Sequence, residues 1–384
     1  MAIPTHHHPE SRRVDAWFDW DSAGEGYTVG AEEELMLVHP PGWALAQTVE
    51  TVLSSLPPEL AEHIQGETHG SAIEIASAPH AKVADVEDDL RSVRRRLTEV
   101  LEPMGLRAAS AGTHPFAVWH DTVISSGERY QKVYGSMREL ARREPTFALH
   151  VHVGVPNPED AIGLLNRMRA HVPLLLALSA NSPFWQGRDS GLASARTPLF
   201  QAFPRVGIPR VFNDYSDYVE AVDLLVRCGS IPEPTFLWWD VRPQPRFGTI
   251  EVRIMDAQTR VEQTAAIAAL VQSIARLEIE SGYVTAKTIW AAEVLDENRF
   301  LAARDGMNAE LIDVDTETRV PAREMLEDLL RACEPHADAL GCAGELARVR
   351  DLAGKTGAER QLELAGDEDR LPGLVETLAD AFVS

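Results

Sequence analysis

The sequence predicts a fold of the α+β class in which polar side chains gather on one face of a β-sheet. Three segments alternate polar and apolar residues with the period of two that marks a strand: Thr28–Val38, Thr146–Val155 and Thr249–Asp256. Long segments with helical periodicity separate them, but without the regular alternation of a doubly wound sheet. No GxGxxG or GxxxxGKS/T motif occurs, so the sequence lacks the common phosphate-binding loops.

The first strand carries three consecutive glutamates. Alternation places Glu32 and Glu34 on one face and Leu35 on the other. Glu33 falls on the apolar side, where a carboxylate is costly unless it lies at an edge or finds a partner. Carboxylates two residues apart on a strand can bridge a hard divalent cation. In isolation, an acidic face in solvent would explain the pair as well.

The other two strands carry ionisable pairs on the same kind of face. His150 and His152 alternate with apolar residues, as do Glu251 and Arg253. Each pair has a plain structural explanation, either a buried histidine with a partner or an ordinary ion pair. The repetition on one sheet face instead predicts a floor for metal ions. Two histidines two residues apart also suit a zinc hydrolase of the amidohydrolase type, which stays the alternative class.

Two further segments near the N-terminus extend this pattern. Ala72–Ser77 is predicted as a strand with Glu74 on its polar face, and Glu67 precedes it in a loop-like segment. Val83–Met104 repeats apolar residues at helical spacing. We expect the arginines of this helix on its exposed face: Arg91, Arg94 and Arg95.

Capping signals and periodicity predict the remaining elements. Asn157 before Pro158 marks the start of a helix that runs toward Leu178. Other predicted elements are a strand over Leu106–Gly112 and helices over Val261–Glu280, Arg323–Leu340, Gly344–Ala353 and Leu374–Phe382.

Two long segments rich in glycine, proline and aromatic residues are predicted as loops, Asn181–Gly207 and Pro232–Pro245. Loops of this length in a compact domain usually form lids or binding sites. Arg188 and Arg196 lie in the first loop, where a guanidinium could clamp a carboxylate or phosphate. A role in keeping the protein surface soluble explains the presence of these two arginines equally well.

Composition narrows the class of protein. The chain has 384 residues and a net charge of −23, which argues against nucleic acid as a partner. Its three cysteines lack metal-site spacing, and its longest apolar run, Val172–Leu178, is too short for a membrane span. We therefore expect a cytoplasmic protein with one domain over residues 1–384 and a mobile segment over residues 1–25, which includes His6–His8. The sequence is compatible with a homo-oligomer.

Blocks of sequence that follow one another along nearly the whole chain carry a family resemblance. They are Gly30–Val38, Ala111–Phe116, His150–Pro156, Ser182–Asp189, Trp239–Pro243, Thr249–Asp256, Asn298–Phe300 and Ala358–Gln361. With these blocks the chain resembles the type-2 glutamate–cysteine ligase family, whose members are also described as carboxylate–amine ligases.

The resemblance implies a glutamine-synthetase-like fold, a curved antiparallel sheet that forms a funnel with helices packed on its convex face. It also implies a set of site residues. Those expected at the metal site are Glu32, Glu34, Glu67, Glu74, His152 and Glu251. Arg253 is expected to face the transferred phosphoryl group and, with Glu32, to act in catalysis. Candidates for binding substrate or phosphate are His150, Arg188, Arg196, Thr113 and His114.

The implied chemistry is ATP-dependent amide formation with Mg²⁺ or Mn²⁺. A substrate carboxylate, glutamate in the named activity, becomes an acyl phosphate, and an amine such as cysteine displaces the phosphate. The chain departs from the family pattern at Leu192, Leu301 and Asp305, which puts the identity of the amine in doubt. A relative that binds nucleotide without catalysis is a further alternative.

Overall fold

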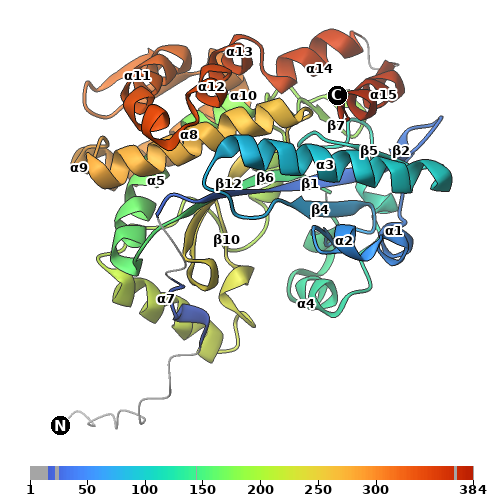
Figure 1. Cartoon of the computed structure of the whole chain (residues 1–384), viewed down its shortest axis with the longest axis horizontal. Coiled ribbons are helices and arrows are strands. Elements are labelled where there is room, and N and C mark those ends of the chain that lie inside the picture. Colours follow the sequence, from blue (N-terminus) through green and yellow to red (C-terminus); the bar gives the residue numbers. More distant parts are fainter. Residues whose placement is uncertain (1–15, 22–25, 144, 367–369, 384) are drawn as a thin grey trace.

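A computed structural model describes residues 16–21, 26–143, 145–366 and 370–383 (Figure 1). Its centre is an eight-stranded antiparallel sheet in the order β11-β12-β6-β1-β4-β3, with β2 and β5 also paired to β1. The strands of this sheet are β1 (Val29–His39), β2 (Ala44–Leu45), β3 (Ile64–Gly66), β4 (Ala72–Ala76), β5 (Arg107–Ala109), β6 (Ala148–Gly154), β11 (Val241–Gln244) and β12 (Thr249–Asp256).

Helices cover one face of this sheet. Figure 1 shows α3 (Val83–Leu101) and α8 (Val261–Glu280) lying along that face, with the helices over residues 322–354 above α8. Near β12 and β11 the sheet packs against α5 (Pro158–Ser179). The C-terminal helices are α9 (Ala286–Trp290), α10 (Ala292–Asp305), α11 (Ala322–Leu340), α12 (Ala343–Ala347), α13 (Val349–Gly354), α14 (Gly357–Ala365) and α15 (Leu371–Ala381).

The opposite face of the sheet carries the polar side chains, and smaller elements surround it. Figure 1 shows α4 (Glu128–Met137) and α7 (Tyr215–Arg227) below the sheet on opposite sides. The remaining small elements of the fold, on either side of the sheet, are α1 (Val49–Ser55), α2 (Pro58–Ala61), α6 (Arg196–Phe200), the pairs β7 (Phe184–Trp185) with β8 (Arg188–Asp189), β9 (Val206–Gly207) with β10 (Trp238–Trp239), and β13 (Glu310–Asp313) with β14 (Thr318–Pro321).

Short 3₁₀ turns complete the connections between these elements. They are η1 (Ala16–Phe18), η2 (Glu102–Met104), η3 (Trp119–Asp121), η4 (Arg138–Arg142), η5 (Pro234–Phe236), η6 (Pro245–Phe247) and η7 (Gly306–Asn308). None of the helices in the described ranges combines the length and apolarity that crossing a bilayer requires.

The three alternating strands are confirmed, and they are neighbours. β6 pairs with β1 on one side, with Glu32 opposite His150, and with β12 on the other, with Glu251 opposite His152. The register shifts between Val252 and Met255, so β12 contains an irregularity that strict alternation did not predict. The strand predicted over residues 106–112 is shorter than expected, because only β5 forms a ladder there.

Most predicted helices are confirmed. Asn157 caps α5 by accepting a hydrogen bond from the backbone of Asp160, as its position before Pro158 indicated. The expectation that Arg94 is exposed is wrong. Arg94 is buried and its Nε and Nη2 atoms contact the Glu33 carboxylate at 2.9 and 2.8 Å. Glu33 thus has the partner that its place on the apolar face requires.

The prediction of a mobile segment over residues 1–25 is wrong for residues 16–21. Phe18 is buried in the core, and Trp20 Nε1 donates a hydrogen bond to the Val155 carbonyl at 3.0 Å. Three aromatic residues close together, Trp17, Phe18 and Trp20, supply the packing surface that anchors this stretch. The remaining residues of the predicted segment that precede Ala16, including His6–His8, lie outside the described residues.

Candidate metal and phosphate site

The polar face of the sheet forms the floor of a cavity of about 480 Å³. The floor residues come from β1, β4, β6 and β12, and the antiparallel register brings them together although Glu32 and Arg253 are 221 positions apart in the sequence. The cavity lining includes Glu32, Glu34, Glu67, Glu74, His150, His152, Glu251, Arg253 and Arg196. The structure therefore brings all six residues predicted for a metal site into one cavity.

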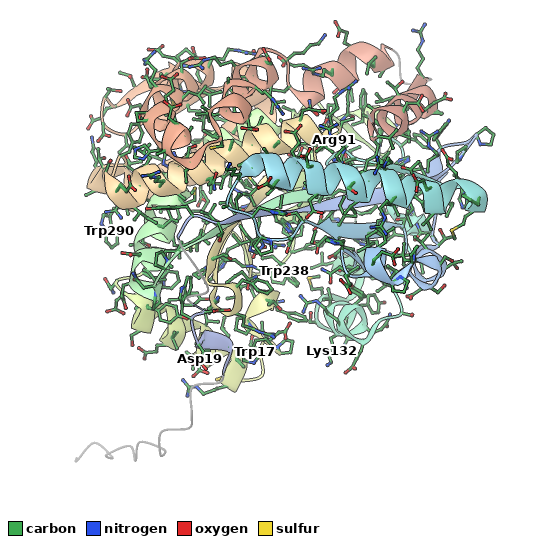
Figure 2. All side chains as sticks on the ribbon, viewed as in Figure 1. Trp17, Asp19, Arg91, Lys132, Trp238 and Trp290 are labelled. Carbon is green, nitrogen blue, oxygen red and sulfur yellow. The ribbon has the colours of Figure 1, made fainter. Side chains whose placement is uncertain are left out.

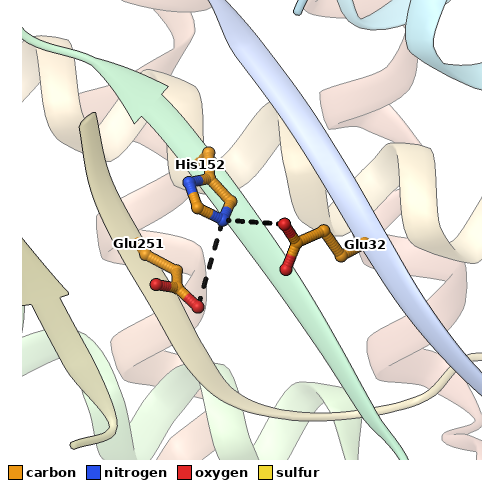
Figure 3. A group of neighbouring side chains, drawn as sticks. All are labelled: Glu32, His152 and Glu251. Atoms are coloured by element: carbon orange, nitrogen blue, oxygen red, sulfur yellow. Dashed lines mark ion pairs between the residues drawn. The ribbon is translucent and has the colours of Figure 1, made fainter. Parts of the chain in front are cut away.

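The first potential ligand group consists of Glu32, His152 and Glu251 (Figure 3). His152 Nε2 lies 3.4 Å from a Glu32 carboxylate oxygen and 3.9 Å from Glu251 Oε1. The other ring nitrogen, Nδ1, lies 3.0 Å from Thr249 Oγ1, which fixes the orientation of the ring. His152 Nε2 is buried without a hydrogen-bond partner among the described residues, as expected for a nitrogen atom that can coordinate a metal ion.

Two further groups continue the row toward β4. One combines Glu32, Glu74 and His150, and the other combines the three carboxylates of Glu34, Glu67 and Glu74. Within each group the potential ligand atoms lie within 4.8 Å of one another. Burial, followed by the charge of Glu34, raises the pKa of Glu67 to about 7. Burial and the charges of the neighbouring carboxylates also raise the pKa of Glu74 well above its usual range.

These residues fit a hard divalent cation. Three carboxylates this close repel one another, and a bound cation would remove that repulsion. Mg²⁺ and Mn²⁺ prefer oxygen ligands, which outnumber nitrogen ligands here. Each of the three groups contains at most one histidine, which disfavours the histidine-rich zinc site of the alternative class.

Arginines balance the charge at the other end of the floor. Burial opposes ionisation of Glu251, but the charges of Arg242 and Arg253 outweigh it and lower its pKa well below the usual range. Arg242 Nε contacts Glu251 at 2.7 Å, and Arg253 Nη1 contacts the same carboxylate. Arg253 also lies 3.4 Å from His150 Nδ1. The floor thus presents carboxylates and guanidinium groups side by side.

Arg196 reaches the cavity from α6. Its Nη1 donates a hydrogen bond to the Ile254 carbonyl at 2.9 Å and its Nη2 to the Arg253 carbonyl at 3.2 Å, both at the irregularity in β12. Its Nε atom is buried without a hydrogen-bond partner in the described structure. Burial lowers the pKa of Arg196, although the nearby Asp256 carboxylate opposes the shift.

Several functional candidates escaped the sequence analysis. Arg242 and Gln244 alternate on β11, and both donate hydrogen bonds to the Glu251 carboxylate at 2.7 Å. Arg242 belongs to a block that carries the family resemblance, but only the pairing of β11 with β12 reveals its contact. Arg129 and Tyr130 line the cavity from α4, a helix without a strong signal in the sequence.

Three predicted binding residues lie away from the cavity lining. Arg188 is exposed on β8. Thr113 is buried and donates a hydrogen bond to the Phe184 carbonyl at 2.8 Å. His114 is buried, and its Nε2 lies 2.8 Å from the Trp43 carbonyl oxygen. Thr113 and His114 thus hold chain segments together.

The three departures from the family pattern also lie outside the cavity lining. Leu301 is buried in the hydrophobic core, and Asp305 pairs with Arg304 at 2.7 Å on the surface. Leu192 is part of the segment after β8. The expectation that these positions select the amine therefore gains no support from their locations.

Comparison with known proteins identifies the family. The sequence model of the glutamate–cysteine ligase family 2 (GCS2) matches residues 28–372. A protein of Rubrobacter xylanophilus, provisionally named glutamate–cysteine ligase 2-1, is 42% identical over 340 residues, which cover 88% of this chain and 90% of the relative. A protein of Sorangium cellulosum, provisionally named glutamate–cysteine ligase 2, is 36% identical over 358 residues, covering 92% of this chain and 96% of the relative.

Solved structures give the same answer for the fold. The crystal structure of glutamate–cysteine ligase from Francisella tularensis in complex with AMP matches with a TM-score of 0.67 at 14% identity, covering 95% of this chain and 90% of that one. A bifunctional glutathione synthetase from Pasteurella multocida matches with a TM-score of 0.67 at 15% identity, covering 93% and 53%. The predicted α+β, glutamine-synthetase-like class is confirmed. The chain belongs to glutamate–cysteine ligase family 2.

Proposed function

We propose that the protein is an ATP-dependent carboxylate–amine ligase that forms an amide through an acyl phosphate. The observation that carries the proposal is the shared floor of the cavity, where potential ligands for a divalent cation lie beside buried arginines. The names of the relatives support glutamate as the acid and cysteine, or a related amine, as the second substrate.

The residues of the floor have two proposed roles, metal binding and stabilisation of phosphate charge. Mg²⁺ or Mn²⁺ held by Glu32, Glu34, Glu67, Glu74, His152 and Glu251 would neutralise phosphate charge during phosphoryl transfer. The neighbouring carboxylates of Glu251 and Glu34 raise the pKa of Arg253 against the opposing effect of burial. The guanidinium of Arg253 therefore stays charged and can donate hydrogen bonds to the oxygens of the transferred phosphoryl group.

The proposed reaction has two steps. An oxygen of the substrate carboxylate attacks the γ-phosphorus of ATP, the bond to ADP breaks, and an acyl phosphate forms. The amine nitrogen then attacks the acyl carbon, the bond to the phosphate oxygen breaks, and the amine loses a proton. Activation is needed because a carboxylate is a poor electrophile. No side-chain nucleophile takes part, so the chain needs only to bind, orient and stabilise charge.

The test is release of phosphate from ATP that requires both an acid and an amine. The protein is screened against amino acids and amines, and the product is identified by mass. Glu32→Gln should reduce this release by at least about 100-fold, because charge stabilisation of this kind is worth about 10²–10³ in turnover. Glu99→Gln, on the exposed part of α3, is the matched control and should leave the rate unchanged.

An isotope experiment tests the intermediate. With the carboxylate oxygens of the acid labelled with ¹⁸O, an acyl phosphate transfers one labelled oxygen to the released phosphate. Phosphate without label would rule out this route. A fully active Glu32→Gln variant would contradict the assignment of the floor.

Other expectations remain proposals. We propose a single domain over residues 1–384, and partners limited to small-molecule substrates, with no nucleic acid and no membrane. We also propose a cytoplasmic location, which is supported by the three cysteines, all free thiols in the structure. Sedimentation of the purified protein would determine whether it forms a homo-oligomer.

A further inference from the structure

The two edges of the sheet are joined across the cavity. In the strand order, β3 and β11 lie at opposite ends. The segment before α4 is tied to the β3 end: Ser125 Oγ donates a hydrogen bond to the Glu67 carbonyl at 2.5 Å, and Gln131 Nε2 donates to the Ser125 carbonyl at 2.8 Å. Tyr130 also contacts the Gly66 carbonyl. The first turn of α4 is therefore fixed beside a candidate metal ligand.

The segment on the other side is tied to β11. Arg242 Nη1 donates hydrogen bonds to the carbonyls of Thr235 and Leu237 at 2.9 and 2.7 Å. The same guanidinium holds the Glu251 carboxylate. The turn at η5 is thus anchored to the opposite end of the floor.

Arg129 connects these two sides. Its Nη1 donates hydrogen bonds to Glu233 Oε1 at 2.5 Å and to Thr235 Oγ1 at 3.2 Å, and its guanidinium carbon lies 5.1 Å from the centre of the Phe236 ring. Arg129, Glu233 and Thr235 all line the cavity. In Figure 2, Trp17 and Trp238 lie on one side of the space below the sheet and Lys132 of α4 on the other. The contacts of Arg129 with Glu233 and Thr235, called the bridge below, therefore connect the wall of the cavity at α4 to the wall at η5.

The bridge is weak enough to open. The side chain of Arg129 is 49% exposed and that of Glu233 is 22% exposed. Ion pairs with this exposure shift an equilibrium by roughly 1.4- to 5-fold. A contact of this strength can favour a closed cavity while it still allows substrates to enter and products to leave.

We propose that Arg129, Glu233 and Thr235 form a latch that closes the cavity over the activated carboxyl group and keeps water away from it. The inference rests on the proposed function. Without the latch, a water oxygen attacks the acyl carbon, the bond to the phosphate oxygen breaks, and the acid is regenerated with loss of a proton. ATP is then consumed without amide formation. Arg129 and Glu233 are positioning residues, because they act by holding the wall closed.

The ratio of phosphate released to amide formed tests the latch. The wild-type protein should give a ratio near one. Arg129→Ala and Glu233→Gln should each raise this ratio by up to about fivefold, because each removes the same ion pair. The reversed pair, Arg129→Glu with Glu233→Arg, should return the ratio toward that of the wild type. An unchanged ratio in both single variants would overturn the proposal.

Arg210→Ala is the matched control. The Arg210–Asp217 ion pair has the same 2.5 Å length, and its side chains are 52% and 24% exposed. Neither residue lines the cavity. This variant should keep the wild-type ratio. If Arg129→Ala instead raises only the KM for the acid and the reversed pair does not restore it, Arg129 binds substrate and the latch is refuted.

Hydrogen exchange separates this proposal from the proposed function. In the protein without substrates, Arg129→Ala should speed amide exchange across α4 by up to about fivefold, whereas Arg210→Ala should not. Unchanged exchange would show that the bridge does not hold α4. If the wild-type protein shows no acid- and amine-dependent phosphate release, the proposed function fails, and the exchange result still decides whether the bridge closes the wall.

Discussion

Individual carboxylates on the floor differ in what balances their charge. Glu251 is surrounded by the protein's own cations and by Gln244, so it stays ionised although it is buried. Glu74 accepts a hydrogen bond from the Gln65 amide at 2.5 Å, and burial together with its carboxylate neighbours raises its pKa. A divalent cation would therefore be most strongly favoured near Glu74, where the uncompensated negative charge is greatest.

Binding of Mn²⁺ in the absence of ATP tests this assignment. Glu74→Gln should weaken Mn²⁺ binding by at least about tenfold, because even indirect partners of a metal contribute that much. Titration followed by the electron paramagnetic resonance of free Mn²⁺ measures the affinity. Glu99→Gln serves as the control, and equal affinity in the two variants would contradict the site.

His114 should give the stability of the protein a dependence on pH. Its Nε2 donates to a carbonyl, and its Nδ1 accepts from the backbone of Phe116 and Ala117 at 3.3 and 3.0 Å. A proton on Nδ1 would face these two donors. Burial lowers the pKa of His114 from 6.5 to about 4, with the hydrogen bond to Trp43 opposing the shift.

Because the folded pKa is depressed, the stabilising contribution of His114 is complete above pH 6.5 and is lost as the pH falls toward 4. The total is about 3 kcal/mol. Urea unfolding between pH 4 and pH 7 should show a flatter profile for His114→Gln than for the wild type. The exposed His39 provides a control, since His39→Gln should leave the slope unchanged. Parallel profiles for the wild type and His114→Gln would refute the prediction.

At the scale of elements, β1 is fixed from both sides. Its cavity face takes part in the metal floor, and on its other face Glu33 pairs with Arg94 of α3. Arg94 also donates hydrogen bonds to the carbonyls of Gln258 and Thr259, which precede α8, at 3.0 and 2.9 Å. One guanidinium thereby connects the central strand to both covering helices.

Removal of this connection should destabilise the fold. Arg94→Met leaves Glu33 buried without its cation, which should lower the free energy of unfolding by about 3–5 kcal/mol. Arg95→Met changes the exposed neighbour on the same helix and should alter it by no more than about 0.5 kcal/mol. Urea unfolding at pH 7 compares the two. A loss below about 1 kcal/mol for Arg94→Met would contradict the account.

Over the whole molecule, local pattern predicted which residues share a face. The family resemblance named Glu32, His152 and Glu251 as metal-site residues. Alternation alone placed a polar pair on one face of each strand, because the period of a strand is a local property. It could not find the partner of Glu33, which lies 61 positions away, or the shift in β12, which depends on its pairing with β6. Glu67 and Glu74 entered through the family resemblance. The cavity wall at α4 depends on distant contacts and was missed, whereas η5 lies within the segment predicted as a loop over Pro232–Pro245.

The residues of the cavity and the helices packed behind the sheet come from different parts of the sequence. Every residue that lines the cavity lies between Trp17 and Arg253 among the described residues. Among the helices after α8, α11, α12 and α13 pack on α8, α10 packs on α5, and α15 packs on β5. Leu301 and Asp305 belong to that backing. Differences in substrate preference among relatives should therefore be sought at the cavity walls, in α4, α6 and residues 233–247.

The three consecutive glutamates of β1 have a consequence for how this sequence can change over time. Glu32 and Glu34 serve the cavity while Glu33 serves the opposite face, so a slip of one residue would exchange their roles. It would bury two carboxylates against a single arginine and leave one on the floor. Selection should thus remove insertions and deletions within Val29–His39, whereas single substitutions at its apolar positions can persist.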